Sequence, residues 1–288
     1  MKKIIALVIV AFGLFACGKG GGGKKAIEIV GSDTLLELVQ AQGEAFTKKT
    51  KIGVSVTGGG SGVGIAKILD GVIDIADASR KMKGKEWKKA KKKGIDIIEV
   101  KVAIDAIAVI VNPSLSLDDI AKEKLEAMYK GEVKNWKEVG GPDVPVSLYG
   151  RQSSSGTFSY FRKKVLHKKD YSSAMKRMAG NAQIVSAVKT DKGGIGYVGI
   201  GYVAGKDRGV KILKVDGVSP ADKEKVLAGN YYISRFLYQY VKKDDIKGRI
   251  KEFLQFELSE EGQKIVEKVG FYPVGVEGGK KLNPVVFQ

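Results

Sequence analysis

The 288-residue sequence is 43% hydrophobic, which supports a packed core and excludes an intrinsically disordered chain. A chain of this length is long for a single hydrophobic core, so two lobes are expected. The net charge of +18 favours anionic partners, but we expect no nucleic-acid binding, because neither a recognition motif nor an interleaving of aromatic and basic residues is present.

The N-terminal segment is typical of an exported lipoprotein. A pair of lysines precedes an apolar run over residues 4–15, which is too short to span a bilayer and suits a signal peptide. The run ends in Leu-Phe-Ala-Cys, which resembles a lipobox, so we expect residues 1–16 to be a signal peptide and Cys17 to be lipidated. An ordinary signal peptide with an incidental cysteine is the alternative. Residues 17–25, rich in Gly and Lys, predict a flexible tether behind the lipidated cysteine.

Strand and helix signals alternate along the rest of the chain, which indicates an α/β fold. Short β-prone runs predict strands over residues 27–30, 54–56, 74–80, 95–100, 106–111, 144–149, 193–202 and 233–240. Apolar positions three and four residues apart predict helices through residues 35–46, 65–69 and 158–165, and a C-terminal helix from about residue 245 to residue 269.

One unit occurs three times: a strand, a loop rich in Ser, Thr and Gly, and then a helix. The loops cover residues 31–34, 58–62 and 151–157. A helix N-terminus presents unpaired N–H groups and a partial positive charge, and in open α/β sheets ligands bind where strands end and helices begin. Three such loops in one exported chain predict an anion site.

The three loops differ in how specific they are. Residues 31–34 also suit an ordinary helix N-cap, and residues 58–62 also suit a plain turn. Residues 151–157 are more specific, because Arg151 adds a guanidinium, which is suited to oxyanions, beside a serine-rich turn that opens a helix.

The order of several motifs resembles the phosphate-binding proteins of bacterial ABC phosphate importers, over essentially the whole mature chain. The most specific piece is Arg151 with the Ser-Gly-Thr sequence at residues 155–157. The similar segments are residues 31–34, 59–62, 74–80, 105–112, 129–131, 135–136, 151–157, 195–198 and 234–238.

This resemblance implies a two-lobed periplasmic-binding-protein fold, type II-like, with hinge strands between the lobes and the ligand in the cleft. The first lobe is expected to comprise residues 26–105 and 211–288, and the second to comprise residues 106–210. It implies extracytoplasmic capture of inorganic phosphate by a monomeric, membrane-anchored lipoprotein, which delivers the phosphate to the permease subunits of an ABC importer. The cell surface and the periplasm both stay open as locations.

Carried over residue by residue, the resemblance also implies the ligand set. Arg151 is expected to pair with the phosphate charge, and the other residues to supply hydroxyls and backbone amides. The expected phosphate-binding residues are Ser32, Asp33, Thr34, Leu35, Ser61, Ser79, Arg80, Arg151, Ser155, Gly156 and Thr157.

Two positions depart from the family pattern. Arg80 stands where some members have Asp, and Phe236 where Pro is frequent. A buried carboxylate accepts the proton of phosphate but rejects sulfate, so the missing Asp bears on selectivity. Asp33, inside the binding loop, is the favoured substitute, with Asp77 and Asp74 as the alternatives. Arg80 is expected either to bind the ligand or to pair with one of these carboxylates.

Three other functions compete with phosphate transport. An enzyme is not expected, because the only histidine, His167, lies in a Lys-rich stretch and no nucleophile elbow, P-loop or dinucleotide fingerprint is present. The same fold could instead bind sulfate or molybdate. A surface adhesin or sensor that binds polyanions through its basic exterior is the third alternative. No cofactor and no metal are expected.

Overall fold

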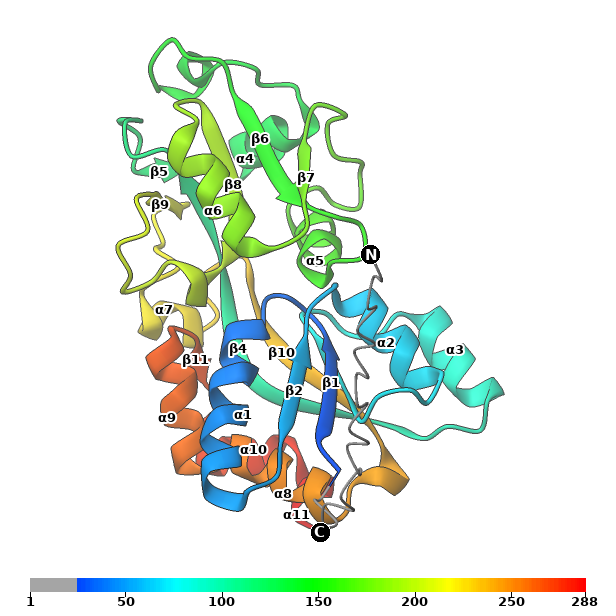
Figure 1. Ribbon diagram of the computed structural model, residues 1–288. Coiled ribbons are helices and arrows are strands. Elements are labelled where there is room, and N and C mark those ends of the chain that lie inside the picture. The colour runs from blue at the N-terminus through cyan, green and yellow to red at the C-terminus, as the bar shows by residue number, and fades with distance from the viewer. Residues whose placement is uncertain (1–24) are drawn as a thin grey trace, which may run out of the picture.

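The computed structural model describes residues 25–288, in which two α/β lobes share one long strand (Figure 1). This strand, β4 (Ile97–Val111), changes partners along its length: it pairs with β10 (Ser234–Lys242) up to Ala106 and with β8 (Gly194–Gly199) from Ile107 onward. Separate strands over residues 95–100 and 106–111 were expected. The intervening residues include β-branched Val and Ile that continue the ladder with β10, so the strand is unbroken.

The first lobe is built on a mixed sheet with the strand order β2-β1-β3-β10-β4. Its first three strands are parallel, and β10 runs antiparallel to both β3 and β4. The remaining strands of this lobe are β1 (Ile27–Gly31), β2 (Val54–Thr57), β3 (Ile75–Ala78) and the short β11 (Tyr272–Pro273), which pairs with β4.

Helices pack around this sheet. They are α1 (Leu36–Thr50), α2 (Ser61–Leu69), α3 (Gly84–Lys92), α8 (Gly248–Glu257), α9 (Glu260–Val269), α10 (Val276–Leu282) and α11 (Pro284–Phe287). The single helix expected over residues 245–269 is therefore wrong. The chain turns at Ser259, whose side chain caps α9 by accepting the N–H of Gly262.

The second lobe contains β6 (Ser147–Arg151) between β8 and β7 (Lys176–Met178). Its other elements are β5 (Asp119–Ile120), β9 (Lys211–Val215), α4 (Lys122–Lys130), α5 (Gly156–Lys164) and α6 (Asn181–Thr190), and α7 (Lys223–Leu227) lies on the return to β10. Because β9 pairs with Val109–Val111 of β4, this sheet extends beyond the expected boundary at residue 210.

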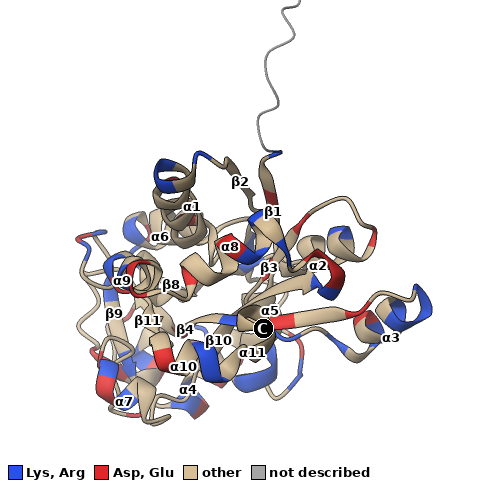
Figure 2. Ribbon diagram, turned by 90° about the horizontal axis from the view of Figure 1, so that it is seen from below, with Lys and Arg blue, Asp and Glu red and all other residues tan. Residues whose placement is uncertain are grey.

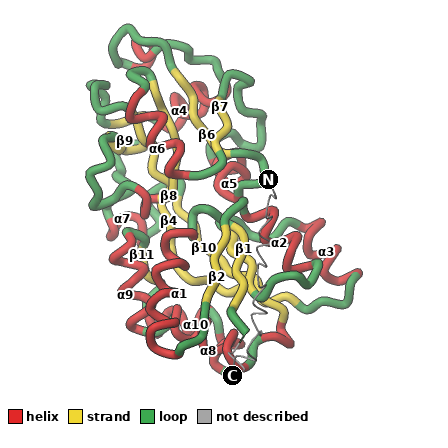
Figure 3. The backbone as a smooth tube through the Cα atoms, viewed as in Figure 1, coloured by secondary structure: helices red, strands yellow, loops and turns green. Residues whose placement is uncertain are grey.

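The two lobes pack so that several loops lie between them. A large apolar cluster continues through both lobes along β4, and a smaller one lies among α2, α3, β3 and β10. In Figure 3 the loops that follow β1 and β6 lie between the lobes. Lys and Arg occur on several sides of the exterior, including a basic tract on α3 (Figure 2). Among residues 25–288, no helix combines the length and apolar character needed to cross a bilayer.

Candidate functional site

The loops after β1 and β6 meet where the lobes touch. Thr34, just after β1, and Thr157, in the first turn of α5, are both fully buried, and their Oγ1 atoms are 2.9 Å apart. Beside them, the N–H of Gly62 donates to the carbonyl of Ser154 over 3.0 Å. Segments 123 and 92 residues apart in the sequence therefore contact one another at the lobe junction.

The loops that follow β2 and β3 in the first lobe add two more hydroxyls, those of Ser61 and Ser79. Ser61 Oγ accepts the N–H of Ser79 at 3.0 Å, and Ser79 Oγ lies 3.4 Å from Thr157 Oγ1. A Cβ atom added to Gly156 would lie 2.3 Å from Ser61 Oγ and 2.6 Å from Ser79 Oγ, so only glycine permits this approach. We call Thr34, Ser61, Ser79 and Thr157 the hydroxyl cluster.

Arg151, the last residue of β6, is buried with hydrogen-bonding capacity left over. Its Nη2 donates to Asp33 Oδ2 at 2.5 Å and to the carbonyl of Ala179 at 2.7 Å. Its Nε and Nη1 are buried without a hydrogen-bond partner among the described residues. Buried donors in native proteins are nearly always paired, so unpaired N–H groups on a buried cation indicate an anion site.

Asp33 connects the two lobes through Arg151. Its Oδ1 accepts the N–H of Gly59, at 3.2 Å, while Oδ2 accepts from Arg151. Its backbone carbonyl accepts from the hydroxyl of Tyr202. The Asp33 carboxylate thus connects the loop that follows β1 to the loop at residues 58–62 and to the guanidinium of Arg151.

The remaining residues of the expected ligand set make local turns. Ser32 Oγ accepts the N–H of Thr34 at 3.3 Å, and the N–H of Leu35 donates to the carbonyl of Ser32 at 3.0 Å. Ser155 caps α5, because its Oγ accepts the N–H of Thr157 at 3.1 Å. These bonds fix the shape of the two loops, and the Ser hydroxyls remain available as donors.

The Nη atoms of Arg80 bind partners outside the hydroxyl cluster. Its two Nη atoms bind both carboxylate oxygens of Glu86, each at 2.8 Å, and Nη1 also donates to the carbonyl of Lys81. Glu86 lies in the first turn of α3, close enough to accept this fork. The partner of Arg80 is therefore Glu86 and none of the carboxylates considered from the sequence.

Asp77 and Asp74 also point elsewhere. Asp77 accepts from Gln239 Nε2, and that same nitrogen donates to Glu257, so the three side chains form a buried group inside the first lobe. Burial raises the pKa of Asp77 to about 7 and raises that of Glu257 well above its usual value. Asp74 is paired with Arg249. Of the three candidate carboxylates, Asp33 is the one in contact with Arg151.

A second arginine contacts the hydroxyl cluster. Arg235 on β10 donates from Nη2 to Thr157 Oγ1 at 2.9 Å and from Nη1 to the carbonyl of Ser79 at 2.7 Å. Its Nε and Nη2 also bind Asp105 Oδ2, and Asp105 Oδ1 accepts the N–H of Ile200. Burial raises the pKa of Asp105, and the neighbouring guanidinium opposes this shift.

Neither Arg235 nor Asp105 is among the residues expected from the sequence. A signal was available, since each is a charged residue inside an apolar strand pattern. Buried charges are retained only where they find partners, so two opposite charges on two buried strands predict a pair. The strand pairing brings them together, because Arg235 lies opposite Asp105 in the ladder of β10 and β4.

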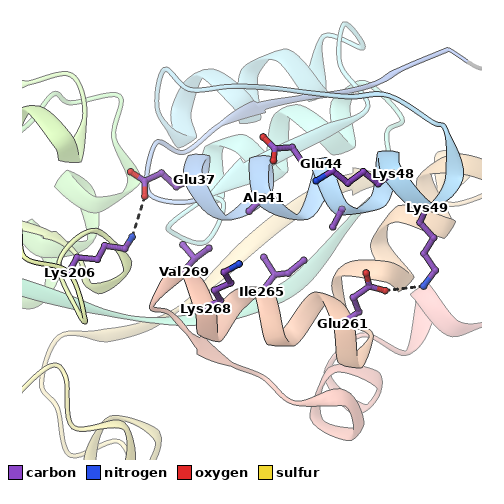
Figure 4. Close-up of a pocket in the computed structure, with 11 residues that line it drawn as sticks. Glu37, Ala41, Glu44, Lys48, Lys49, Lys206, Glu261, Ile265, Lys268 and Val269 are labelled. Carbon is purple, nitrogen blue, oxygen red and sulfur yellow. Dashed lines mark hydrogen bonds and ion pairs between the residues drawn. The ribbon is translucent and has the colours of Figure 1, made fainter.

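A groove separate from the hydroxyl cluster lies between α1 and α9. It encloses about 840 Å³ between α1 and α9, with Ala41 and Ile265 on its floor (Figure 4). Two ion pairs lie at its ends, Lys206 with Glu37 and Lys49 with Glu261. It contains none of the expected ligand residues, so we do not assign the candidate site to it.

Known proteins resemble the chain in sequence and in structure. Residues 19–261 match the model of a PBP superfamily domain. The phosphate-binding protein PstS of Staphylococcus aureus (strain USA300) is 35% identical over 274 residues, which cover 90% of this chain and 83% of that protein. PstS of Bacillus subtilis (strain 168) is 32% identical, with 95% and 94% covered.

A solved structure has a similar fold. The putative phosphate ABC transporter substrate-binding protein of Clostridium perfringens, crystallised with bound phosphate, superimposes with a TM-score of 0.80 at 33% identity, covering 87% of this chain and all of that one. The two PstS relatives bear the name of phosphate-binding proteins, and the Clostridium perfringens protein that of a transporter substrate-binding protein. The chain therefore belongs to the PBP superfamily and, within it, to the family of the phosphate-binding protein PstS.

Proposed function

We propose that this chain binds inorganic phosphate between its lobes and delivers it to the permease subunits of an ABC importer. The names of its relatives support this function. The single observation that carries it is Arg151: the side chain is buried at the lobe junction, yet Nε and Nη1 have no partner among residues 25–288. An oxyanion supplies acceptors and negative charge together.

The proposed ligand set divides into a charge and several neutral donors. Arg151 provides the charge, and its contact with Asp33 fixes the guanidinium in place. The proposed neutral donors are hydroxyls and backbone amides of the loops that follow β1, β2, β3 and β6. They are Ser32, Thr34, Ser61, Ser79, Ser155, Gly156 and Thr157, together with the amide of Leu35, which would exchange its bond to the carbonyl of Ser32 for one to the ligand. Each charge-assisted bond contributes roughly 1.5–3 kcal/mol.

Closure of the lobes is part of the proposed binding step. The hydroxyls of Thr34 and Thr157 touch one another at 2.9 Å, so an oxyanion enters between them only when the lobes part. β4 and β10 run through the junction and are the natural hinge. Closing around the anion then replaces its water with fixed donors.

Selectivity for phosphate over sulfate requires an acceptor for the phosphate proton. We assign this role to Asp33, whose carboxylate contacts Arg151 and Gly59 and retains lone pairs. Sulfate carries no proton near neutral pH, so its oxygens would face that carboxylate without a hydrogen bond between them, which is costly for a partly buried charge. Asp33→Asn should therefore narrow the preference for phosphate over sulfate.

The proposal includes the cellular setting expected from the sequence. Cys17, which lies outside the described residues, would carry the lipid, and residues 18–25 would tether an extracytoplasmic monomer near its importer. Tethering raises the effective concentration of the receptor at the membrane. No catalytic role and no nucleic-acid partner are proposed, and the absence of turnover on a panel of phosphomonoesters is the corresponding test.

Titration calorimetry with phosphate, followed by competition with sulfate, tests the proposed function. We expect saturable phosphate binding with one-to-one stoichiometry that excess sulfate does not displace. Equal competition by sulfate would reassign the ligand to tetrahedral oxyanions in general. Absence of any phosphate binding, with binding of heparin that falls steeply with salt, would favour the polyanion adhesin instead.

A further inference from the structure

A pocket of about 440 Å³ lies beside the hydroxyl cluster and is lined by both lobes. The first lobe contributes residues 80–83 after β3, and the second contributes α5 through Tyr160 and Lys163. Arg235 also lines this pocket while donating to Thr157, so one side chain contacts both the pocket and the hydroxyl cluster. We call this space the interlobe pocket.

The interlobe pocket is strongly cationic. Four lysines line it, and they form no ion pair with any residue of the described chain; they are Lys81, Lys83, Lys163 and Lys164. No Asp or Glu within residues 25–288 lines it. Partial burial and the nearby Arg80 lower the pKa of Lys83, as expected where positive charge is concentrated.

One of the lining residues carries a buried donor without a partner among the described residues. Arg80 lines the interlobe pocket with a side chain only 8% exposed, and its Nε has no hydrogen-bond partner among the described residues. Its two Nη atoms are occupied by Glu86. The pair with Glu86 therefore positions Arg80 and offsets its charge, but it leaves one buried N–H unpaired.

The charge is arranged for a ligand with several anionic groups. Two lysines lie on each side of the junction, so both lobes contribute positive charge to the pocket. The walls between them are apolar and aromatic, formed by Met82, Tyr160 and Tyr238. A chain of phosphoryl groups matches the distributed charge, and the aromatic walls suit a base attached to such a chain.

We propose that the interlobe pocket binds a polyphosphate group, either free or carried by a nucleotide. Because both lobes line the pocket, this ligand binds best when the lobes are closed. Phosphate and the polyphosphate should then strengthen one another's binding, since both favour the same closed arrangement. The pocket stands on its own residues, and only this mutual effect rests on the proposed function.

Tripolyphosphate and ATP are the probes, titrated at low ionic strength into the full chain saturated with orthophosphate. The test variant is Lys81→Met with Lys83→Met and Lys163→Met, which removes charge and retains the apolar stems. We expect tripolyphosphate binding to weaken by at least about tenfold, because three of the charges that attract it are lost. The matched control is Lys88→Met with Lys91→Met and Lys92→Met, three exposed lysines of α3 whose loss changes net charge equally.

The outcomes separate the sources of the ligand and the two sites. Tighter binding of ATP than of tripolyphosphate would identify a nucleotide, and the reverse order a free phosphate chain. Displacement of orthophosphate by tripolyphosphate, or an equal loss in both lysine variants, would overturn the pocket assignment. So would the absence of binding to the saturated protein. Orthophosphate titration of the same variants reports the proposed phosphate site separately and should change by less than about twofold.

Discussion

Two arginine–aspartate pairs lie at the lobe junction, and they differ in how much hydrogen-bonding capacity the arginine has left. Arg235 uses all three nitrogens, on Asp105, Thr157 and the carbonyl of Ser79. Arg151 uses Nη2 alone, and its Nε and Nη1 are unpartnered within the described chain. Both guanidinium groups are almost completely buried.

This difference distinguishes a structural ion pair from a binding one. A saturated, buried pair is already satisfied and holds β4, β10 and α5 in place. An unsaturated pair leaves buried N–H donors without acceptors, and a ligand can supply those acceptors. Burial alone does not make this distinction, whereas the number of partnered nitrogens does.

Breaking the saturated pair should have the largest effect, and the effect should be on stability. Asp105→Ala leaves Arg235 buried without its counter-charge, which typically costs about 3–5 kcal/mol. Chemical denaturation measures the free energy of unfolding. Asp118→Ala, which removes an exposed carboxylate paired with Lys211, is the control and should cost less than about 1 kcal/mol. Equal losses in the two variants would remove the structural role of Asp105.

Breaking the unsaturated pair should affect binding. Arg151→Ala should weaken phosphate binding by about tenfold to over a hundredfold, because one or more charge-assisted bonds of roughly 1.5–3 kcal/mol are lost. Calorimetry gives the dissociation constant. Arg162→Ala, at a more exposed position on α5, should leave it unchanged. Wild-type affinity in Arg151→Ala would show that the unpartnered donors do not face the ligand.

The contact between the lobes can be blocked without touching either pair. Gly156→Ala places a Cβ against Ser61 and Ser79 across the junction, and such overpacking typically costs about 1–3 kcal/mol. Phosphate affinity should fall accordingly, because closure is impeded. Gly180→Ala is the matched control, since nothing lies within 4 Å of a Cβ there. Unchanged affinity in Gly156→Ala would mean that binding does not need this degree of closure.

Asp77 is a buried carboxyl without a cationic partner among the described residues, so it should make the stability of the protein depend on pH. Burial raises its pKa from 3.8 to about 7, so the folded protein holds a proton that the unfolded chain releases. The associated stability is complete below about pH 4 and is lost as the pH rises through about 7. Asp77→Asn should flatten the decline in melting temperature over this range. Glu252→Gln, on the exposed side of α8, should leave the slope unaltered.

Arg80 should give the smallest effect on phosphate. Its fork is bound to Glu86, so Arg80→Met should change the dissociation constant for orthophosphate by less than about twofold. The same calorimetric titration measures this, with Arg151→Met as the comparison. A loss as large as that of Arg151→Met would return Arg80 to the ligand set.

The convergence of the three loops could be anticipated because it depends on local rules. Strands that end in Ser, Thr and Gly loops before helices bring those loops to one edge of a sheet, and Thr34, Ser61 and Thr157 do lie together. The family resemblance supplied the order of the lobes. The helix break at Ser259 could also have been predicted from the sequence, because Ser is a preferred N-cap residue and two glutamates follow it in the first turn of α9.

The contacts that the sequence did not predict join residues whose elements meet only in the folded chain. The direction of Arg80 is set by Glu86, which comes close only once α3 packs beside β3. Arg235 and Asp105 become recognisable as a pair only when β10 is placed against β4. The continuity of β4 likewise depends on its pairing with β10, since residues 101–105 include two charged side chains and resemble a strand end.

Crystals grown with arsenate, a tetrahedral analogue of phosphate with a measurable anomalous signal, test the central claim most directly. The anomalous peak should lie between the lobes, within hydrogen-bonding distance of Arg151 Nε or Nη1 and of hydroxyls from both lobes, including those of Thr34 and Thr157. A single peak in the groove between α1 and α9, or against Arg235 with no contact to Arg151, would contradict the account.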